Sequence, residues 1–349
     1  MPSVSQHNDV QVSTRATWPA HFGDVKDEFA ALKSTAGVYN LAARARFRLT
    51  GTDRVRWLNG MVTNNIRDLG VGEGVYAFLL NPQGHILGDL TTYHRGEYLL
   101  VETDQMQADK ILSTFDHFII MDDVEIANVS ETLVTIGLTG PKAETFLRSA
   151  GFGLPDLKIL QVTDQAWQET TVTIVRCGSE RYPSYEIWIA PPQADSLLKA
   201  LQRADAVPVG LDALELYRVA LGIPRYGQDI RERDLPQETE QQRALNFNKG
   251  CYVGQEIVER IRSRGAVHRK FTGFKFAGPL PPPGTKVRAQ AKDVGEVTSS
   301  ALIPAPEGDQ AVALGYIRRE FGAAGKELDI AGSAAMVSDL PFADLLKTQ

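Results

Sequence analysis

The chain has 349 residues, of which 43% are hydrophobic and 23% charged, as expected for a globular protein of two or three domains. Its net charge of −6 argues against a protein that binds nucleic acid over its whole surface. The two cysteines, Cys177 and Cys251, form no CxxC pair, which excludes a complete Cys-ligated iron–sulfur site within one chain and favours a reducing, cytoplasmic location.

Residues 1–15 are polar and contain no apolar stretch of the kind found in signal peptides, so we expect a flexible tail. No apolar run approaches the roughly 20 residues that are needed to span a bilayer. Residues 16–277 mix short strands with helices, which predicts α+β layers and not one continuous parallel sheet.

Several elements can be predicted from local patterns. The alternation in Arg46–Thr50 indicates a strand, and Thr52 or Asp53 is placed to cap the helix that follows. The remaining predictions in this region are a hairpin of Val75–Leu80 and Ile86–Thr92, a strand over Tyr98–Glu102, a helix over Met106–Phe118 and a strand over Tyr185–Ala190.

A proline-rich stretch, Gly278–Gly284, can continue neither a helix nor a central strand and predicts a domain boundary. Short strand candidates follow around Val287, Gly295–Thr298, Ala311–Tyr316 and Leu328–Val337. They predict a small C-terminal β-barrel or sandwich over residues 278–349.

Four blocks along the chain resemble the glycine-cleavage T-protein (aminomethyltransferase-like) superfamily: Gly51–Asn64, Leu80–Asp89, Gly210–Gly227 and Gly295–Ser299. A fifth, Lys-Gly-Cys-Tyr-Val-Gly-Gln-Glu over Lys249–Glu256, resembles the signature of the YgfZ-type folate-binding branch of that superfamily. The resemblance implies two interleaved α+β domains within 16–277, a C-terminal barrel, and tetrahydrofolate or a one-carbon derivative as ligand.

Two carboxylates correspond by position to residues of the superfamily's folate site. Glu186 aligns with the residue that holds the pterin, whose amino group and ring N–H suit a carboxylate; the alternative is a solvated glutamate on a strand. Asp109 matches the catalytic aspartate, although Glu102 and Thr103 replace the residues expected upstream. The alternative for Asp109 is a helix-surface residue beside Lys110.

Two further residues are candidates for folate binding. Arg218 matches a recurrent arginine, but an ion pair with Glu215 three residues earlier explains it equally well. Tyr76 alternates with Phe78 on the predicted strand and would stack on a pterin, although aromatic residues on strands more often belong to the core.

Cys251 is the candidate reactive group of the fifth block. Gly250 and Gly254 allow a tight turn that exposes the thiol, and the nearby ammonium of Lys249, which is also a candidate for folate binding, would favour the thiolate. The alternative is a buried, inert cysteine.

Three arginines follow this block at alternating positions: Arg260, Arg262 and Arg264. The spacing predicts that they share one face of an extended segment, available to a folate tail, an acidic partner or tRNA. The alternative is a solvated strand face.

Three functions remain open. The YgfZ resemblance implies a folate-dependent accessory protein for assembly or repair of iron–sulfur enzymes, with iron–sulfur assembly or client proteins as partners. Asp109 and Glu186 also fit an aminomethyltransferase of the glycine cleavage system, whereas the block around Cys251 favours the first function. The third is a scaffold that has kept the fold and lost the ligand.

Overall fold

The computed structural model describes residues 18–179, 181–265 and 267–347. The chain divides into two compact units: one comprises residues 1–44 and 129–213, and the other comprises residues 45–128 and 214–349. Each unit therefore contains two separate stretches of chain, as the predicted interleaving requires. The predicted tail over residues 1–15 lies outside the described residues.

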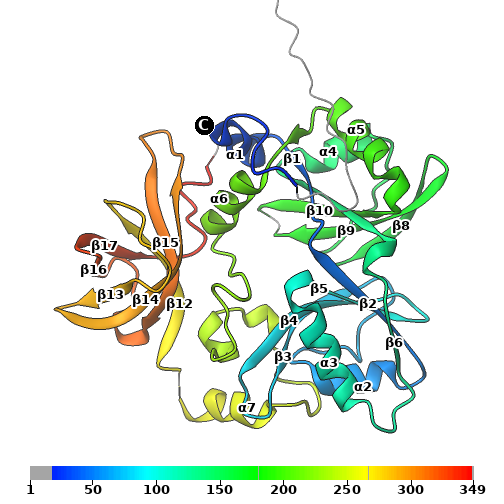
Figure 1. The fold of residues 1–349 in the computed structure, drawn as a ribbon, viewed down its shortest axis with the longest axis horizontal. Coiled ribbons are helices and arrows are strands. Elements are labelled where there is room, and N and C mark those ends of the chain that lie inside the picture. The colour runs from blue at the N-terminus through cyan, green and yellow to red at the C-terminus, as the bar shows by residue number, and fades with distance from the viewer. Residues whose placement is uncertain (1–17, 180, 266, 348–349) are drawn as a thin grey trace, which may run out of the picture. The chain divides into compact units, whose positions relative to one another are not determined.

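Unit 1 contains a six-stranded sheet with strand order β11-β1-β7-β10-β9-β8 (Figure 1). All neighbouring strands are antiparallel except β1 and β11. Helix α4 contacts β10, and α5 contacts β1 and β7. The elements are α1 (Val25–Ser34), β1 (Gly37–Asn40), β7 (Val134–Thr139), α4 (Ala143–Ser149), β8 (Val162–Trp167), β9 (Thr170–Gly178), β10 (Pro183–Ile189), α5 (Ala194–Arg203) and β11 (Val207–Pro208).

The first stretch of unit 2 forms a five-stranded sheet with order β3-β4-β5-β2-β6. Its elements are β2 (Arg44–Thr50), α2 (Arg54–Met61), β3 (Gly74–Leu80), β4 (Ile86–His94), β5 (Leu99–Asp104), α3 (Ala108–Phe118) and β6 (Glu125–Asn128). Apolar residues of α2 and α3 share one core cluster with residues of β2, β3, β4 and β5. The predicted hairpin is thus present as β3 and β4. Asp53 is the N-cap of α2, but its side chain makes no capping hydrogen bond.

The second stretch of unit 2 continues from α6 (Leu211–Leu221) through α7 (Gln255–Arg264) into a closed six-stranded barrel (Figure 1). The barrel strands are β12 (Arg269–Phe276), β13 (Lys286–Ala289), β14 (Lys292–Ile303), β15 (Gln310–Arg318), β16 (Glu327–Ile330) and β17 (Ser333–Ser338). Thirteen buried apolar residues fill its core.

The barrel differs from the sequence prediction in two places. Its first strand, β12, ends before Gly278, so the proline-rich stretch is the β12–β13 connection and the boundary predicted at 278 lies one strand too late. The single candidate Leu328–Val337 is two strands, β16 and β17, because Ala331 and Gly332 form a turn with positive φ between them.

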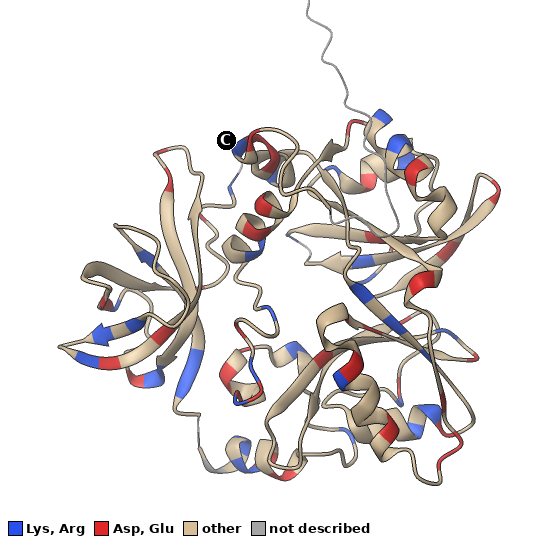
Figure 2. Cartoon of the chain, in the orientation of Figure 1, with Lys and Arg blue, Asp and Glu red and all other residues tan. Residues whose placement is uncertain are grey.

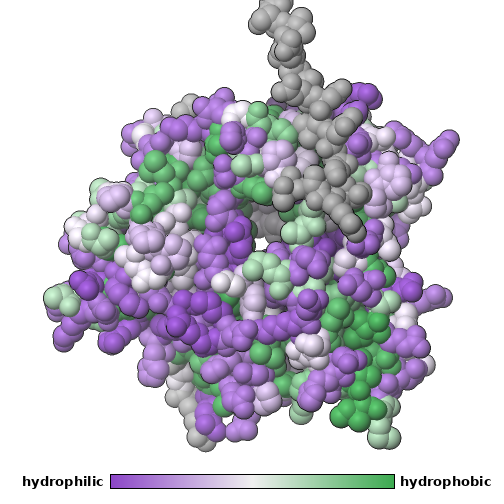
Figure 3. All heavy atoms as spheres, viewed as in Figure 1, coloured by the Kyte–Doolittle hydropathy of each residue, from purple (hydrophilic) through white to green (hydrophobic). Residues whose placement is uncertain are grey.

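The surface seen in Figure 3 is largely hydrophilic, as expected for a chain whose apolar side chains are concentrated in internal clusters. Among the described residues, no helix is both long enough and apolar enough to cross a bilayer.

Candidate functional site

The partly buried carboxylate of Asp89 is the centre of a hydrogen-bonded cluster in unit 2. The phenol of Tyr76 donates to Asp89 Oδ2 at 2.7 Å, and Gln107 Nε2 donates to Oδ1 at 2.7 Å. Gln107 Oε1 in turn accepts the backbone N–H of Asp89 at 2.9 Å. Both carboxylate oxygens are therefore held in fixed directions while the side chain remains partly exposed.

Local sequence explains why this cluster forms. Tyr76 and Asp89 lie on the paired strands β3 and β4, and Gln107 immediately precedes α3. A Cβ atom on Gly88 would lie 3.0 Å from Gln107 Oε1, so the glycine leaves the space that the glutamine side chain occupies. The order Gly88-Asp89 inside an apolar strand is the sequence signal for this site.

The electrostatics fix which group carries the proton. Burial, followed by the charge of Asp89 and the hydrogen bond to it, raises the pKa of Tyr76 well above its ordinary value of 10.0. The guanidinium of Arg243, 4.8 Å from the centre of the Tyr76 ring, opposes this rise. Tyr76 is thus a neutral donor, and a carboxylate held in this way can orient or exchange a proton on a ligand nitrogen.

Asp109 lies in α3, two residues after Gln107. It is exposed in the first turn of α3, whereas Ala108 and Ile111 point into the core. The neighbouring Lys110 donates to Tyr226 Oη at 3.0 Å and forms an ion pair with Glu232. This is the helix-surface position that the alternative described, and a catalytic role for Asp109 stays a prediction.

Glu102, which replaces a neutral residue expected by resemblance, is buried in the core of unit 2. Its carboxylate pairs with Arg46 at 2.6 Å, and both side chains are almost fully buried. A carboxylate paired with an arginine in this way contributes to the core and does not act as a second free charge beside the site.

Glu186 lies on β10 in unit 1 and is 7% exposed, which contradicts the solvated alternative. Its carboxylate oxygens accept long hydrogen bonds from Arg44 Nη2 at 3.5 Å and Trp188 Nε1 at 3.4 Å. A buried carboxylate beside an indole suits a flat heterocycle with paired N–H donors. Its role in folate binding stays a prediction.

A row of polar groups crosses the same sheet beside Glu186. Tyr39 Oη and Thr139 Oγ1 are 2.7 Å apart, and Thr139 Oγ1 and Ser184 Oγ are 2.6 Å apart. Gly137 pairs in register with both Tyr39 and Glu186, and a Cβ atom there would lie 2.2 Å from the Tyr39 ring. Glycine is therefore required for the tyrosine to lie across the strand.

Arg218 connects α6 to the barrel within unit 2. Its Nε and Nη2 donate to Glu215, at 2.9 and 2.7 Å, and its Nη1 donates to Asp229 at 2.8 Å. Nη2 also reaches Ser299 Oγ of β14 at 2.9 Å. These bonds include the predicted pair with Glu215 and fit a structural role. Folate binding by Arg218 remains a prediction.

Lys249 points into unit 2, with only 6% of the residue exposed. Its Nζ donates to the backbone carbonyls of Asn59, Val62 and Asn64, at 2.5, 2.6 and 2.7 Å. These carbonyls lie at and just beyond the C-terminal end of α2, where orphan carbonyls accept cations. All three ammonium donors have backbone partners, which favours a structural role over folate binding.

Cys251 is exposed, which contradicts the buried alternative. Its neighbours are anchored on both sides: Lys249 as described above, and Tyr252 in a cluster with Phe78. Gly254 has φ of 82°, and a Cβ atom there would lie 2.6 Å from the carbonyl oxygen of Asn81. The predicted turn is therefore present and packs on the β3–β4 loop.

The three arginines after this turn lie on α7, so the predicted extended segment is wrong. Arg260 pairs with Glu256 at 3.0 Å and Arg262 with Glu259 at 3.6 Å. Figure 2 shows both signs of charge on this helix. In a helix, residues two apart do not share a face, so Arg262 does not lie in one row with Arg260 and Arg264.

Within the described ranges, no group of three His, Cys, Asp or Glu side chains is arranged to hold a metal ion. The chemistry that these residues offer is hydrogen bonding and proton transfer at Asp89 and Glu186, and thiol chemistry at Cys251.

Two protein-family models match successive parts of the chain. The model of the GCVT N-terminal domain matches residues 6–249, and that of the glycine cleavage T-protein C-terminal barrel domain matches residues 269–344. The chain belongs to the glycine cleavage T-protein family.

Relatives of this T-protein-family chain extend over nearly its whole length. An aminomethyltransferase of Nostoc sp. is 29% identical over 345 residues, covering 93% of this chain and 89% of the relative. An aminomethyltransferase of Thermus thermophilus is 28% identical over 340 residues, covering 94% of this chain and 93% of the relative. The solved aminomethyltransferase T of Bartonella henselae is similar in fold, with a TM-score of 0.84, 22% identity and coverage of 96% and 94%.

Proposed function

We propose that this protein binds a reduced folate and transfers a one-carbon unit to it, as an aminomethyltransferase of the glycine cleavage type. The observation that carries the proposal is the carboxylate of Asp89, held by Tyr76 and Gln107 and still partly exposed. The relatives that match over most of the chain are named aminomethyltransferase, which supports the same reaction.

Each unit supplies one carboxylate whose own chemistry fits part of tetrahydrofolate. The pterin presents an amino group and an adjacent ring N–H, a donor pair that Glu186 can accept. The folate nitrogen that forms the new C–N bond must lose its proton, while the aminomethyl carrier is released as its free thiol and ammonia; Asp89 can accept that proton and pass it on. The folate supplies the nucleophilic nitrogen when bound, and the protein binds, orients and exchanges a proton.

A transfer assay tests this proposal. Tetrahydrofolate and an aminomethylated lipoyl carrier protein are mixed with the wild type and with the Asp89→Asn and Asp109→Asn variants. We expect methylene-tetrahydrofolate from the wild type and from Asp109→Asn, and loss of turnover in Asp89→Asn. Turnover that depends on Asp109 and not on Asp89 would overturn the assignment.

A second candidate is the folate-binding accessory protein that supports iron–sulfur enzymes. The exposure of Cys251, fixed between two anchored residues, specifically favours it, because ordinary transfer to folate needs no thiol. One thiolate cannot hold a cluster alone, so it would contact a carrier or share a ligand set with a partner.

Complementation separates the two candidates. In cells that lack the protein, Cys251→Ser should restore glycine cleavage if the protein is a transferase. If the accessory function is correct, Asp89→Asn but not Cys251→Ser restores iron–sulfur enzyme activity. Failure of wild-type protein to bind tetrahydrofolate at millimolar concentration would reject both and leave the folate-free scaffold.

A further inference from the structure

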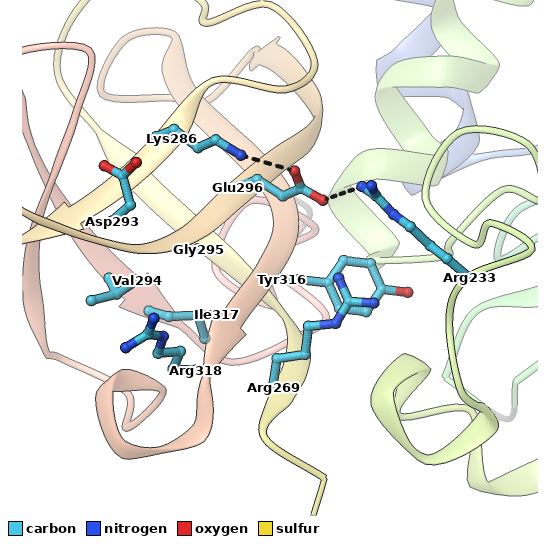
Figure 4. A pocket seen from close by; sticks show the side chains of 10 residues that line it. All are labelled: Arg233, Arg269, Lys286, Asp293, Val294, Gly295, Glu296, Tyr316, Ile317 and Arg318. Carbon is cyan, nitrogen blue, oxygen red and sulfur yellow. Dashed lines mark hydrogen bonds and ion pairs between the residues drawn. The ribbon is translucent and has the colours of Figure 1, made fainter.

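A cavity of about 500 Å³ lies on the outer wall of the barrel in unit 2, between β14, β15 and the start of β12 (Figure 4). Four cations line it against two carboxylates: Arg233, Arg269, Lys286 and Arg318 against Asp293 and Glu296. The excess of positive charge indicates an anionic ligand.

The cations do not contribute equally. Arg269 donates to Asp234 at 2.7 Å and to Glu238 at 2.9 and 3.0 Å, so two carboxylates neutralise it. Its guanidinium lies 4.7 Å from the centre of the Tyr316 ring. Figure 4 shows the two side chains at the barrel wall. Arg269 therefore forms a wall of the cavity, and the charge available to a ligand comes from other residues.

Glu296 accepts from more cations than it can neutralise. Its carboxylate contacts Arg231 at 2.6 Å, Arg233 at 2.9 Å and Lys286 at 3.4 Å. Burial opposes ionisation of Glu296, but these cations outweigh it and lower the pKa of the carboxyl. The side chains of Arg233 and Lys286 are 62% and 50% exposed, so both can contact a ligand as well.

Two further groups complete the anion site. Arg318 is exposed and has no carboxylate at ion-pair distance in the described part of the chain. Tyr316 is 1% exposed, and its hydroxyl has no hydrogen-bond partner among the described residues. Burial raises the pKa of this phenol, which keeps it a neutral donor.

The segment 226–234 connects this cavity to the Asp89 cluster within unit 2. The backbone N–H of Ile86 donates to the carbonyl of Asp234 at 3.1 Å, and Tyr226 Oη donates to the carbonyl of Leu87 at 2.5 Å. The phenol of Tyr316 is also near enough to Tyr76 to contribute to the rise of its pKa. The cavity and the Asp89 cluster are therefore held by the same segment, since Arg231 and Arg233 of this segment also contact Glu296.

We propose that this cavity binds the carboxylates of a γ-linked glutamate tail on the reduced folate, with Lys286, Arg233 and Arg318 as the contacting cations. This inference rests on the proposed function, which provides the folate head. The arginines of α7 are less suitable, because Arg260 and Arg262 pair with glutamates of their own helix.

The test compares the dissociation constants of tetrahydrofolate with one and with three glutamates by calorimetry. We expect the wild type to bind the triglutamate about fivefold more tightly, since two or three exposed ion pairs contribute about 1 kcal/mol in total. The double variant Lys286→Ala/Arg318→Ala should lose this difference and keep its affinity for the monoglutamate. Lys326→Ala, which removes an exposed cation of the barrel that does not line the cavity, is the matched control and should keep it.

Equal affinity of the wild type for both folates overturns the tail site while leaving folate binding intact. Free γ-triglutamate peptide provides a second test that does not depend on the folate head. Peptide binding by the wild type that the double variant abolishes supports the site. If neither protein binds the peptide at millimolar concentration and the two folates also bind equally, the site is rejected. Displacement by inorganic phosphate with no dependence on tail length would identify a simple oxyanion site and also overturn the inference.

Discussion

Replacing Lys249 by methionine tests whether its ammonium stabilises the fold. Methionine keeps the apolar stem and removes the three hydrogen bonds to the carbonyls of Asn59, Val62 and Asn64. Each buried carbonyl left without a donor costs about 1–3 kcal/mol. Part of that cost is offset because the variant no longer has to bury the charge of the Lys249 ammonium. We expect the free energy of unfolding to fall by about 3 kcal/mol at pH 6, where the amine is protonated.

Urea denaturation followed by circular dichroism measures this change. The exposed Lys326 supplies the control, since Lys326→Met should change the free energy of unfolding by less than about 0.5 kcal/mol. A loss below about 1 kcal/mol for Lys249→Met would refute the reasoning, because it would mean that the ammonium contributes nothing beyond its stem.

The same residue makes stability depend on pH. Burial lowers the pKa of Lys249 from 10.5 to about 7, so between these values the unfolded chain holds the additional proton. The free energy of unfolding of the wild type, relative to Lys249→Met, should therefore rise from pH 7 to about 10.5, by at most about 1.4 kcal/mol per pH unit. Below pH 7 the difference should be constant.

Three other results are expected. Asp89→Asn should lower single-turnover transfer by at least about 100-fold while the free energy of unfolding changes by less than about 1 kcal/mol, because the amide is nearly isosteric; activity within threefold of the wild type would contradict this. The exposed thiol of Cys251 should react rapidly with a disulfide reagent in the native protein. Cys251→Ser should abolish this rapid reaction without altering the melting temperature. Gly137→Ala should destabilise unit 1 by about 2 kcal/mol, measured by thermal denaturation, whereas Gly153→Ala, with open space around its Cα, should not.

Local patterns were sufficient for some of the fold. The β3–β4 hairpin was predictable because apolar alternation and the turn at Asn81–Gly84 are both short-range features. Leu328–Val337 contained a comparable turn signal at Ala331-Gly332 that the strand prediction passed over. Arg260 and Arg262 were placed on a strand by their spacing, although the i,i+4 pair Glu256–Arg260 is a helix signal.

The site depended on contacts that no local pattern contains. Lys249 meets its carbonyl partners from residues about 190 positions earlier in the chain, so the sequence suggested a ligand contact where the structure has a helix end. Asp89 lies in the block Leu80–Asp89, but only the packing of Gln107 over Gly88 shows that its carboxylate is held in place. Superfamily position selected Asp109 instead, which the fold leaves on the surface.

The interleaved course of the chain has a consequence for how the protein is made and divided. The path passes from one unit to the other after residues 44, 128 and 213. Neither unit can be expressed as one uninterrupted fragment, and no single cut leaves both intact. During synthesis, the carbonyls at the end of α2 lack this donor until Lys249 has been made, 185 or more residues later. We therefore expect the five-stranded sheet of unit 2, which packs on α2, to become stable only late in synthesis. A fragment that ends before residue 249 should be sensitive to protease around α2.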